Sequence, residues 1–262
     1  MKKITFLLVF ISIFGYAQTA ITDANRQMAV TDCLSTNPVD GMCSDSEYGA
    51  MPNWDVSSVT NMGAMFEYAS SFNADISNWD VSSVTNMSTM FANASSFNRD
   101  VSNWDISSVT DMKVMFAYAS SFNQSLNDWE TSSVTNMYAM FAYASSFNGD
   151  ISNWDVSSVN NMSNMFSYAS SFNGDVSNWD VSRITNMNTM FTNASSFNQP
   201  LNDWDVSSVT DMYAMFANAS SFNRDLSNWD VSSVTEMRVM LGNSALSTEN
   251  YDALLNGWSQ QN

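Results

Sequence analysis

Residues 72–96 read FNADISNWDVSSVTNMSTMFANASS, and a near copy of this stretch begins every 25 residues. Tryptophan keeps this interval without a slip, at positions 54, 79, 104, 129, 154, 179, 204 and 229. Met87, Met90 and Phe91 have counterparts at the same interval in nearly every unit. A fixed period of this length indicates a stacked repeat, in which each unit buries its apolar face against its neighbours. The sequence therefore predicts a solenoid of about eight rungs.

The second half of each unit has the spacing of a helix. Its apolar residues lie three or four positions apart, as along one face of an α-helix: Val84, Met87, Met90, Phe91 and Ala94. Ser83 directly precedes this stripe and is a suitable N-cap. We therefore expect a helix of about three turns in every rung.

The first half of the unit, residues 75–81, has a different pattern. Ile76, Trp79 and Val81 follow the apolar spacing of a leucine-rich-repeat strand, and in an extended chain Trp79 and Val81 share one face. Each rung is then a strand, a tight turn and a returning helix. Stacking such rungs predicts an α/β solenoid, with a parallel sheet on one side, parallel helices on the other, and Trp, Met and Phe between them.

The chain divides into four parts. Residues 1–17 have a basic start, a short apolar run and a small-residue cleavage site after Ala17, which predicts a secretory signal peptide. Residues 18–53 should form an N-terminal cap, residues 54–245 the repeats, and residues 246–262 a C-terminal capping helix and tail. We expect a secreted or extracellular protein, with attachment to the cell surface as the alternative.

Both caps carry specific signals. Cys33 and Cys43 stand close together ahead of the repeats, and in an oxidising compartment they should form a disulfide. A metal-binding pair is the poorer interpretation, because the chain has no histidine and no further thiol. At the other end an apolar stripe with helical spacing follows Ser247 and Thr248, either of which can cap a helix: Tyr251, Leu254, Leu255 and Trp258.

The formal net charge of −18 narrows the class of partners. Nucleic acid and anionic lipid surfaces both attract Lys and Arg, of which the chain has only 8. The negative charge therefore argues against nucleic-acid binding. We also expect no membrane insertion, because the apolar run within residues 1–17 is too short to span a bilayer. Divalent cations or cationic partners remain compatible with the charge.

The composition also argues against an enzyme. Without histidine, and with both cysteines in the cap, the chain lacks the usual nucleophile arrangements. It has no glycine-rich phosphate loop. Carboxylate pairs such as Asp75 and Asp80 recur in rung after rung, whereas acid–base catalysis needs two different environments. We predict a non-enzymatic protein without a cofactor, except that calcium stays open.

An acidic residue follows the tryptophan in every repeat. Carboxylates of neighbouring rungs should lie about 4.8 Å apart. They repel one another, so another interaction must compensate for this repulsion. One interpretation is that each accepts N–H groups of the following turn. The other is calcium bound between rungs, since oxygen ligands suit that ion. The predicted calcium ligands are Asp80, Asp105, Asp155, Asp180, Asp205 and Asp230.

Two further columns stand out. Asparagine recurs at positions 73, 98, 123, 148, 173, 198 and 223, and a structural hydrogen-bonded ladder is favoured over a binding role. On the predicted outer helix face Tyr118, Tyr143 and Tyr168 line up as an exposed aromatic strip. Such a strip suits a contact surface, although exposed tyrosines are also found without a partner.

The unit FNxDISNWDVSSVTNMxxMFxxASS, seen at 72–96, 97–121 and 147–171, resembles the repeat of BspA-like leucine-rich-repeat surface proteins of bacteria. More narrowly, it resembles the 25-residue repeat of mycoplasma-type surface lipoproteins. The similarity covers about residues 50–258. The resemblance implies a right-handed, leucine-rich-repeat-like coil at the cell surface, with adhesion inferred for some relatives and no catalytic residues.

These observations lead to one expected function and one alternative. The expected function is a non-enzymatic exported or cell-surface repeat protein that acts as a binding or adhesion module for an extracellular protein or a glycan. The alternative is a structural spacer or matrix component, stabilised by divalent cations on the acidic ladder.

Overall fold

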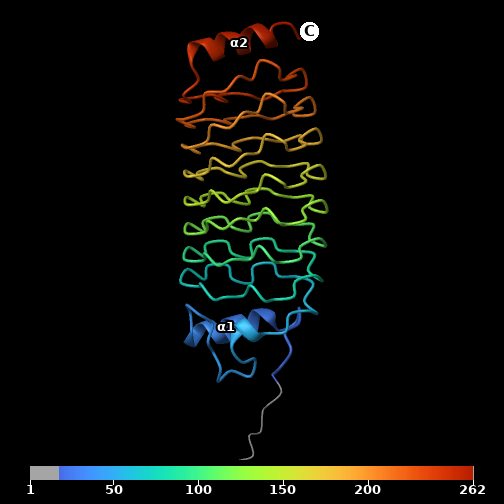
Figure 1. Cartoon of the computed structure of the whole chain (residues 1–262), viewed down its shortest axis with the longest axis vertical. Coiled ribbons are helices and arrows are strands. Elements are labelled where there is room, and N and C mark those ends of the chain that lie inside the picture. Colours follow the sequence, from blue (N-terminus) through green and yellow to red (C-terminus); the bar gives the residue numbers. More distant parts are fainter. Residues whose placement is uncertain (1–17, 262) are drawn as a thin grey trace, which may run out of the picture.

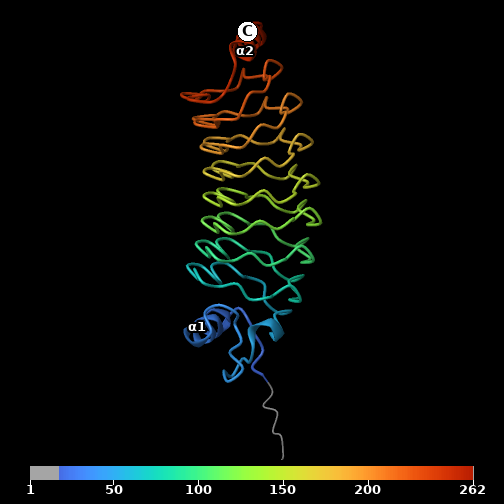
Figure 2. The ribbon, with the colours of Figure 1, turned by 60° about the vertical axis from the view of Figure 1, so that its left-hand side comes forward.

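The computed structural model describes residues 18–261, and the predicted signal peptide lies outside them. The chain forms an elongated stack of rungs, seen edge-on in Figure 1 and still stacked after the turn to Figure 2. Two helices, α1 (Arg26–Thr36) and α2 (Thr248–Trp258), lie across its two ends, and a short 3₁₀ helix, η1 (Met51–Asn53), precedes the first tryptophan. Among the described residues no helix is both long and apolar enough to cross a bilayer.

The predicted helix in each rung is wrong. Across residues 54–245 the described chain contains no helix, and Ser83 caps nothing. Met87, Thr89, Phe91 and Asn93 donate their backbone N–H groups to carbonyl oxygens of the next rung, at 2.8 to 3.0 Å. Residues between them close tight turns, as in the bond from the Met90 N–H to the Met87 carbonyl at 3.2 Å. Four-residue turns and a helix space their buried side chains alike, so the stripe did not distinguish them.

The predicted strand is also wrong. Trp79 N–H donates to the Ile76 carbonyl at 3.2 Å and Val84 N–H to the Val81 carbonyl at 2.8 Å, so this half of the rung consists of turns. In the described residues the only sheet-like pairing is a series of isolated parallel bridges, one between each rung and the next, from Asn61 with Asn86 to Asp211 with Glu236. The fold is therefore a solenoid of turns without the predicted sheet and helix layers; the right-handedness of the coil stays a prediction.

The core confirms the stacked repeat. The eight repeat tryptophans are at most 5% exposed, and neighbouring rings lie parallel, as for Trp154 and Trp179 with centroids 6.3 Å apart. Each rung before the last adds a phenylalanine pair such as Phe141 and Phe147, whose centroids are 3.9 Å apart, whereas the last rung has Leu241 at the first of these positions. Paired aromatic rings contribute beyond the area they bury. All rungs but the last thus repeat the same aromatic layer.

Polar ladders run along the stack beside this core. From Trp104 to Trp229, each repeat tryptophan donates its indole N–H to a backbone carbonyl of the preceding rung, as from Trp104 to Ile76 at 3.1 Å. The asparagine ladder is present as well: the backbone N–H of Asn98 donates to Oδ1 of Asn73 at 3.0 Å, and each later asparagine repeats this bond. Buried indoles need such partners, and the stack provides them at every rung.

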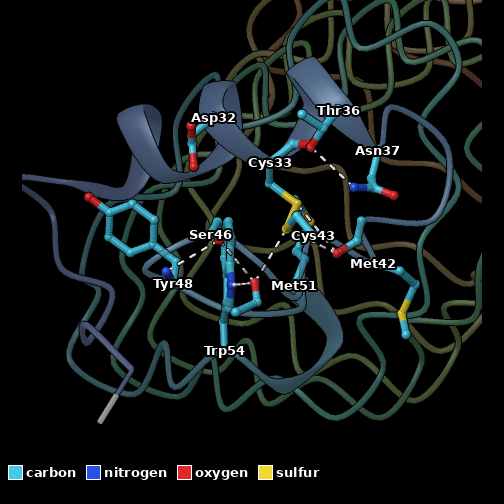
Figure 3. Close-up of a disulfide and its surroundings, with 12 residues drawn as sticks. Asp32, Cys33, Thr36, Asn37, Met42, Cys43, Ser46, Tyr48, Met51 and Trp54 are labelled. Atoms are coloured by element: carbon cyan, nitrogen blue, oxygen red, sulfur yellow. Dashed lines mark hydrogen bonds between the residues drawn. A yellow bond between two sulfur atoms is a disulfide. The ribbon is translucent and has the colours of Figure 1, made fainter. Parts of the chain in front are cut away.

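The N-terminal cap closes the first rung. Cys33 of α1 and Cys43 form a disulfide beneath the helix, close to Trp54 (Figure 3). Trp54 donates its indole N–H to the carbonyl of Gly49 at 2.9 Å. Asp23 accepts the backbone N–H of Thr60 at 3.0 Å. In the next rung the equivalent residue, Thr85, donates its backbone N–H to the carbonyl of Thr60 at 2.8 Å. The cap thereby supplies the acceptors that the first rung would otherwise lack.

The C-terminal cap is the helix expected from the sequence. Ser247 is the N-cap of α2, and its hydroxyl accepts the backbone N–H of Asn250 at 3.3 Å. Leu254 is buried against the last rung, whereas Tyr251 and Leu255 are half exposed. Trp258 donates its indole N–H to the Leu226 carbonyl at 3.1 Å, which continues the bonding pattern of the repeat tryptophans.

Candidate binding surface

The structure brings Tyr118, Tyr143 and Tyr168 together as a stacked column on the outside of the solenoid. Their ring centroids are 4.3 and 4.4 Å apart, and the ring planes differ by 6° and 7°. The three side chains are 46%, 38% and 42% exposed. Unlike the buried aromatic columns, this one presents ring edges and hydroxyl groups to solvent.

Turn geometry fixes the direction of these tyrosines. Tyr143 is the third residue of the turn Phe141–Ala144, which closes with a bond from the Ala144 N–H to the Phe141 carbonyl at 3.0 Å. Its φ is +60°, a value that the third residue of a type II turn requires. The backbone N–H of Tyr143 donates to the carbonyl of Ser167 in the next rung at 2.7 Å, which holds the turn in place.

Tyrosine is an unusual choice at this position. Residues with a bulky side chain rarely adopt positive φ, and such a conformation costs on the order of 1–3 kcal/mol. The same column has residues that suit the conformation better in other rungs: Asn93, Asn193, Asn218 and Asn243. Stacking between neighbouring rings offsets part of the cost, at about 0.5–1.5 kcal/mol per pair.

The tyrosine column borders a groove that runs along the stack. Four tyrosines, five serines and two asparagines line it, from Tyr68 at one end to Asn193 at the other; we call it the tyrosine groove. The serines form a second column two residues after the tyrosines. Ser95 donates its hydroxyl proton to the Ser70 carbonyl at 3.2 Å, and Ser120 donates to the Ser95 carbonyl at 3.3 Å. Their oxygen lone pairs therefore remain available as acceptors.

The groove lacks charged side chains of its own. Burial, followed by the neighbouring Tyr118 and Tyr168, raises the pKa of Tyr143 above its ordinary value of 10.0. The phenol therefore stays neutral at physiological pH. The surface offers aromatic rings and hydroxyl groups, which suit the contact area of a partner rather than proton transfer.

The structure places the predicted acidic ladder in a row of local turns. Oδ1 of Asp80 accepts the backbone N–H of Ser82 at 3.1 Å and its hydroxyl at 2.6 Å. The carboxylates that make the same pair of bonds are Asp105, Asp155, Asp180 and Asp205, while Asp230 accepts only the backbone N–H of Ser232. The hydroxyl of Ser82, then its N–H, lowers the pKa of Asp80.

These hydrogen bonds stabilise the carboxylates against their mutual repulsion, as the interpretation of the ladder as a row of turn acceptors requires. Among residues 18–261 no group of three or more acidic, cysteine or histidine side chains could hold a metal ion. Calcium binding by the ladder therefore stays a prediction without a clustered donor set to support it. A calcium titration of chelator-stripped protein tests it, since bound ion would raise the melting temperature.

Sequence reasoning found the tyrosines but missed the serine column. In most units two serines follow an alanine that recurs every 25 residues, for example Ser95 and Ser96 after Ala94. The pattern alone does not tell which of the two serines lies beside a tyrosine. It also gave no signal that the tyrosine positions have positive φ. Both properties depend on turns that only the stacked rungs stabilise.

Comparison with known protein families identifies the repeat. The model of a family described as a mycoplasma protein of unknown function, DUF285, matches the chain twice, over residues 39–154 and 140–258. Searches of curated proteins and of solved structures returned no match. The two family matches together cover residues 39–258, which include all of the rungs and parts of both caps but not α1. The chain therefore belongs to the DUF285 family of mycoplasma proteins of unknown function, and it is a repeat protein with two copies of the family's matching unit.

Proposed function

We propose that this protein is a non-enzymatic, exported or cell-surface binding module, and that a partner contacts it along the tyrosine groove. The observation that carries the proposal is the stacked, exposed column of Tyr118, Tyr143 and Tyr168. The core columns repeat nearly the same side chains at every rung, whereas this column changes between Tyr and Asn, and a second surface column, which includes Ser88, Lys113 and Tyr138, also varies. A surface that breaks the repeat can recognise a particular partner.

Three further points support this role. Tyrosine is enriched at the cores of protein interfaces, because its ring is large and its hydroxyl can bond. Three stacked tyrosines at positive φ retain a backbone cost that asparagine would reduce. The sequence resembles BspA-like surface proteins, for some of which adhesion is inferred, and residues 1–17 have the pattern of a secretory signal. The partner class is an extracellular protein or a glycan.

The test compares two variants of residues 18–262 on arrays of extracellular proteins and glycans. The first variant changes Tyr118, Tyr143 and Tyr168 to Asn, the residue that other rungs have at this column and that tolerates positive φ. The control changes Tyr138 to Ser and Tyr213 to Asn, since these tyrosines are equally exposed but lie outside the groove.

We expect the parent and the control to bind the same array members, and the groove variant to lose them by at least about tenfold, as for interface tyrosines that act as hot spots. Thermal melts of all three proteins check that the fold is retained. Binding that survives the triple change would place the contact elsewhere. A parent that binds no array member would leave the alternative of a structural spacer as the better account.

A further inference from the structure

The tyrosine column is interrupted once, and the interruption has the dimensions of a cation site. Tyr68, Asn93 and Tyr118 occupy three successive rungs of the column, with φ of +61°, +62° and +60°. Their side chains therefore leave the backbone in the same direction. Asparagine is much shorter than tyrosine, so this column has no ring in the rung between Tyr68 and Tyr118; we call this gap above Asn93 the slot. All three residues line the tyrosine groove.

The width of the slot follows from the spacing of the rungs. Tyrosines in adjacent rungs of this column have centroids 4.3 Å apart. Tyr68 and Tyr118 are two rungs apart, which corresponds to about 9–10 Å at the usual spacing of stacked chains. A cation midway between them lies about 5 Å from each ring, within the ~6 Å over which a cation and an aromatic ring attract each other.

The polar surroundings favour a cation that donates several hydrogen bonds. None of the residues that line the groove is Lys or Arg, and the chain as a whole has a net charge of −18. Ser95 and Ser120 use their hydroxyl protons on backbone carbonyls, so they present acceptors. A guanidinium group is planar, has five N–H donors and no acceptor, and stacks on aromatic rings.

The molecule already contains one contact of this kind. The guanidinium carbon of Arg238 lies 5.7 Å from the ring centroid of Tyr213, which belongs to the preceding rung. Arg238 also pairs with Glu236 at 2.9 Å. An exposed tyrosine of this solenoid can therefore hold a guanidinium that reaches it from one rung away.

We propose that the slot formed by Tyr68, Asn93 and Tyr118 binds an arginine side chain of a basic partner segment. This inference rests on the proposed function, because it assigns the chemistry of the partner at one end of the tyrosine groove. The guanidinium stacks between the two rings, and the serine hydroxyls accept its N–H groups. The acidic chain attracts the basic segment, and the slot selects arginine over lysine.

The test uses three synthetic peptides of the same length, in which three Arg residues are kept, changed to Lys, or changed to neutral citrulline. Fluorescence anisotropy at about 0.15 M salt, where exposed charges are screened beyond ~8 Å, measures their affinities for residues 18–262. We expect the Arg peptide to bind at least about fivefold more tightly than the Lys peptide and the citrulline peptide to bind weakest.

Asn93→Tyr fills the slot without changing the charge. Four other rungs already have a tyrosine at this column, so the backbone accommodates the new side chain. Asn218→Tyr is the matched control, because Asn218 has a φ of +59° in the same column, does not line the groove, and has Asn193 and Asn243 as its neighbours in the column, so the change fills no slot between tyrosines. We expect Asn93→Tyr to weaken the Arg peptide about tenfold and to abolish the preference over Lys, and Asn218→Tyr to do neither.

Tyr68→Asn is a second, independent test of the slot. It removes one of the two rings that form the slot and introduces a residue that tolerates positive φ. It should weaken Arg binding as Asn93→Tyr does. Equal affinity for the Arg and Lys peptides, or unchanged Arg binding in both slot variants, overturns the proposal. If array binding is still lost in the Tyr118, Tyr143 and Tyr168 variant, the groove remains the contact surface and only the arginine assignment fails.

Discussion

At the scale of single residues, the repeat tryptophans show how one side chain supports two neighbours. Trp154 is 3% exposed and its ring stacks on Trp129 and Trp179, each with a centroid distance of 6.3 Å. Its indole N–H donates to the Leu126 carbonyl at 2.8 Å. A central tryptophan therefore packs against the rungs on both sides and adds a buried hydrogen bond to the preceding rung.

We predict that Trp154→Ala lowers the free energy of unfolding by about 3–5 kcal/mol, because it opens a cavity in the aromatic layer. Trp154→Phe keeps a stacked ring but removes one of the two donors to the Leu126 carbonyl, which still accepts the backbone N–H of Trp129, and the lost bond should cost about 0.5–1.5 kcal/mol. Urea denaturation followed by circular dichroism measures both values. A loss below about 1 kcal/mol for the alanine variant would contradict the inward-facing stack.

The aspartate turns give stability that depends on pH. Serine hydroxyl groups, then serine N–H groups, lower the pKa of Asp80 and Asp105 below the ordinary value of 3.8. For Asp80 the neighbouring carboxylates act in the opposite direction but less strongly. A carboxyl whose pKa is lower in the folded state contributes stability above its unfolded pKa, and this contribution is lost as the pH falls through the folded pKa.

The melting temperature should therefore change little between about pH 7 and pH 5 and fall as the pH drops below about 4. The double variant with Ser82 and Ser107 changed to Ala should melt lower at neutral pH and show a shallower fall in acid. The control is the double variant with Ser83 and Ser108 changed to Ala, because the aspartates accept their hydrogen bonds from Ser82 and Ser107 instead. Identical acid profiles for the two variants would contradict the assignment.

At the scale of elements, the ends and the middle of the chain follow different rules. In α2 the N-cap Ser247 and the buried Leu254 agree with the helix that the sequence predicts. In the rungs the same kind of apolar stripe forms turns instead. Ser, Thr and Asn, which compete for backbone hydrogen bonds and are weak helix formers, occupy most positions between the apolar residues. A neighbouring rung then provides acceptors that an isolated helix would find within itself.

We predict that Leu254→Ala detaches the C-terminal cap, whereas Leu255→Ala does not. Leu254 is 2% exposed and Leu255 is 48% exposed, although both belong to α2. The first change should cost about 2–5 kcal/mol of local stability and the second less than about 1 kcal/mol. Hydrogen exchange at the backbone amides of the last rung reports the difference; equal protection in the two variants would show that α2 does not cover that rung.

At the scale of the whole molecule, stability comes from contacts between adjacent rungs. Indole-to-carbonyl, asparagine and backbone bonds all join a rung to its neighbours, and the aromatic columns continue from rung to rung. Such a stack behaves as a sum of units and junctions, with caps at its ends. The length of the solenoid is therefore adjustable in whole rungs.

Deleting residues 172–196 removes one complete rung and joins Ser171 to Phe197, which restores the repeat. This variant should fold, and small-angle scattering should show a particle shorter by about 4.8 Å. Deleting only residues 172–184 shifts every later side chain out of its column and should prevent the C-terminal rungs from forming a cooperative unit. A half-rung deletion that melts like the whole-rung deletion would mean that register does not matter.

The sequence by itself determined the period, the inward direction of Trp, Met and Phe, the asparagine ladder and the C-terminal helix. An unbroken interval of 25 residues leaves identical side chains at identical places, and burial then selects the apolar ones. Only the tertiary structure decided that the rungs consist of turns, since apolar spacing is the same for turns and helices. It also decided the positive φ of Tyr118 and the stacking of Tyr143 on both its neighbours, because these depend on hydrogen bonds and rings of adjacent rungs.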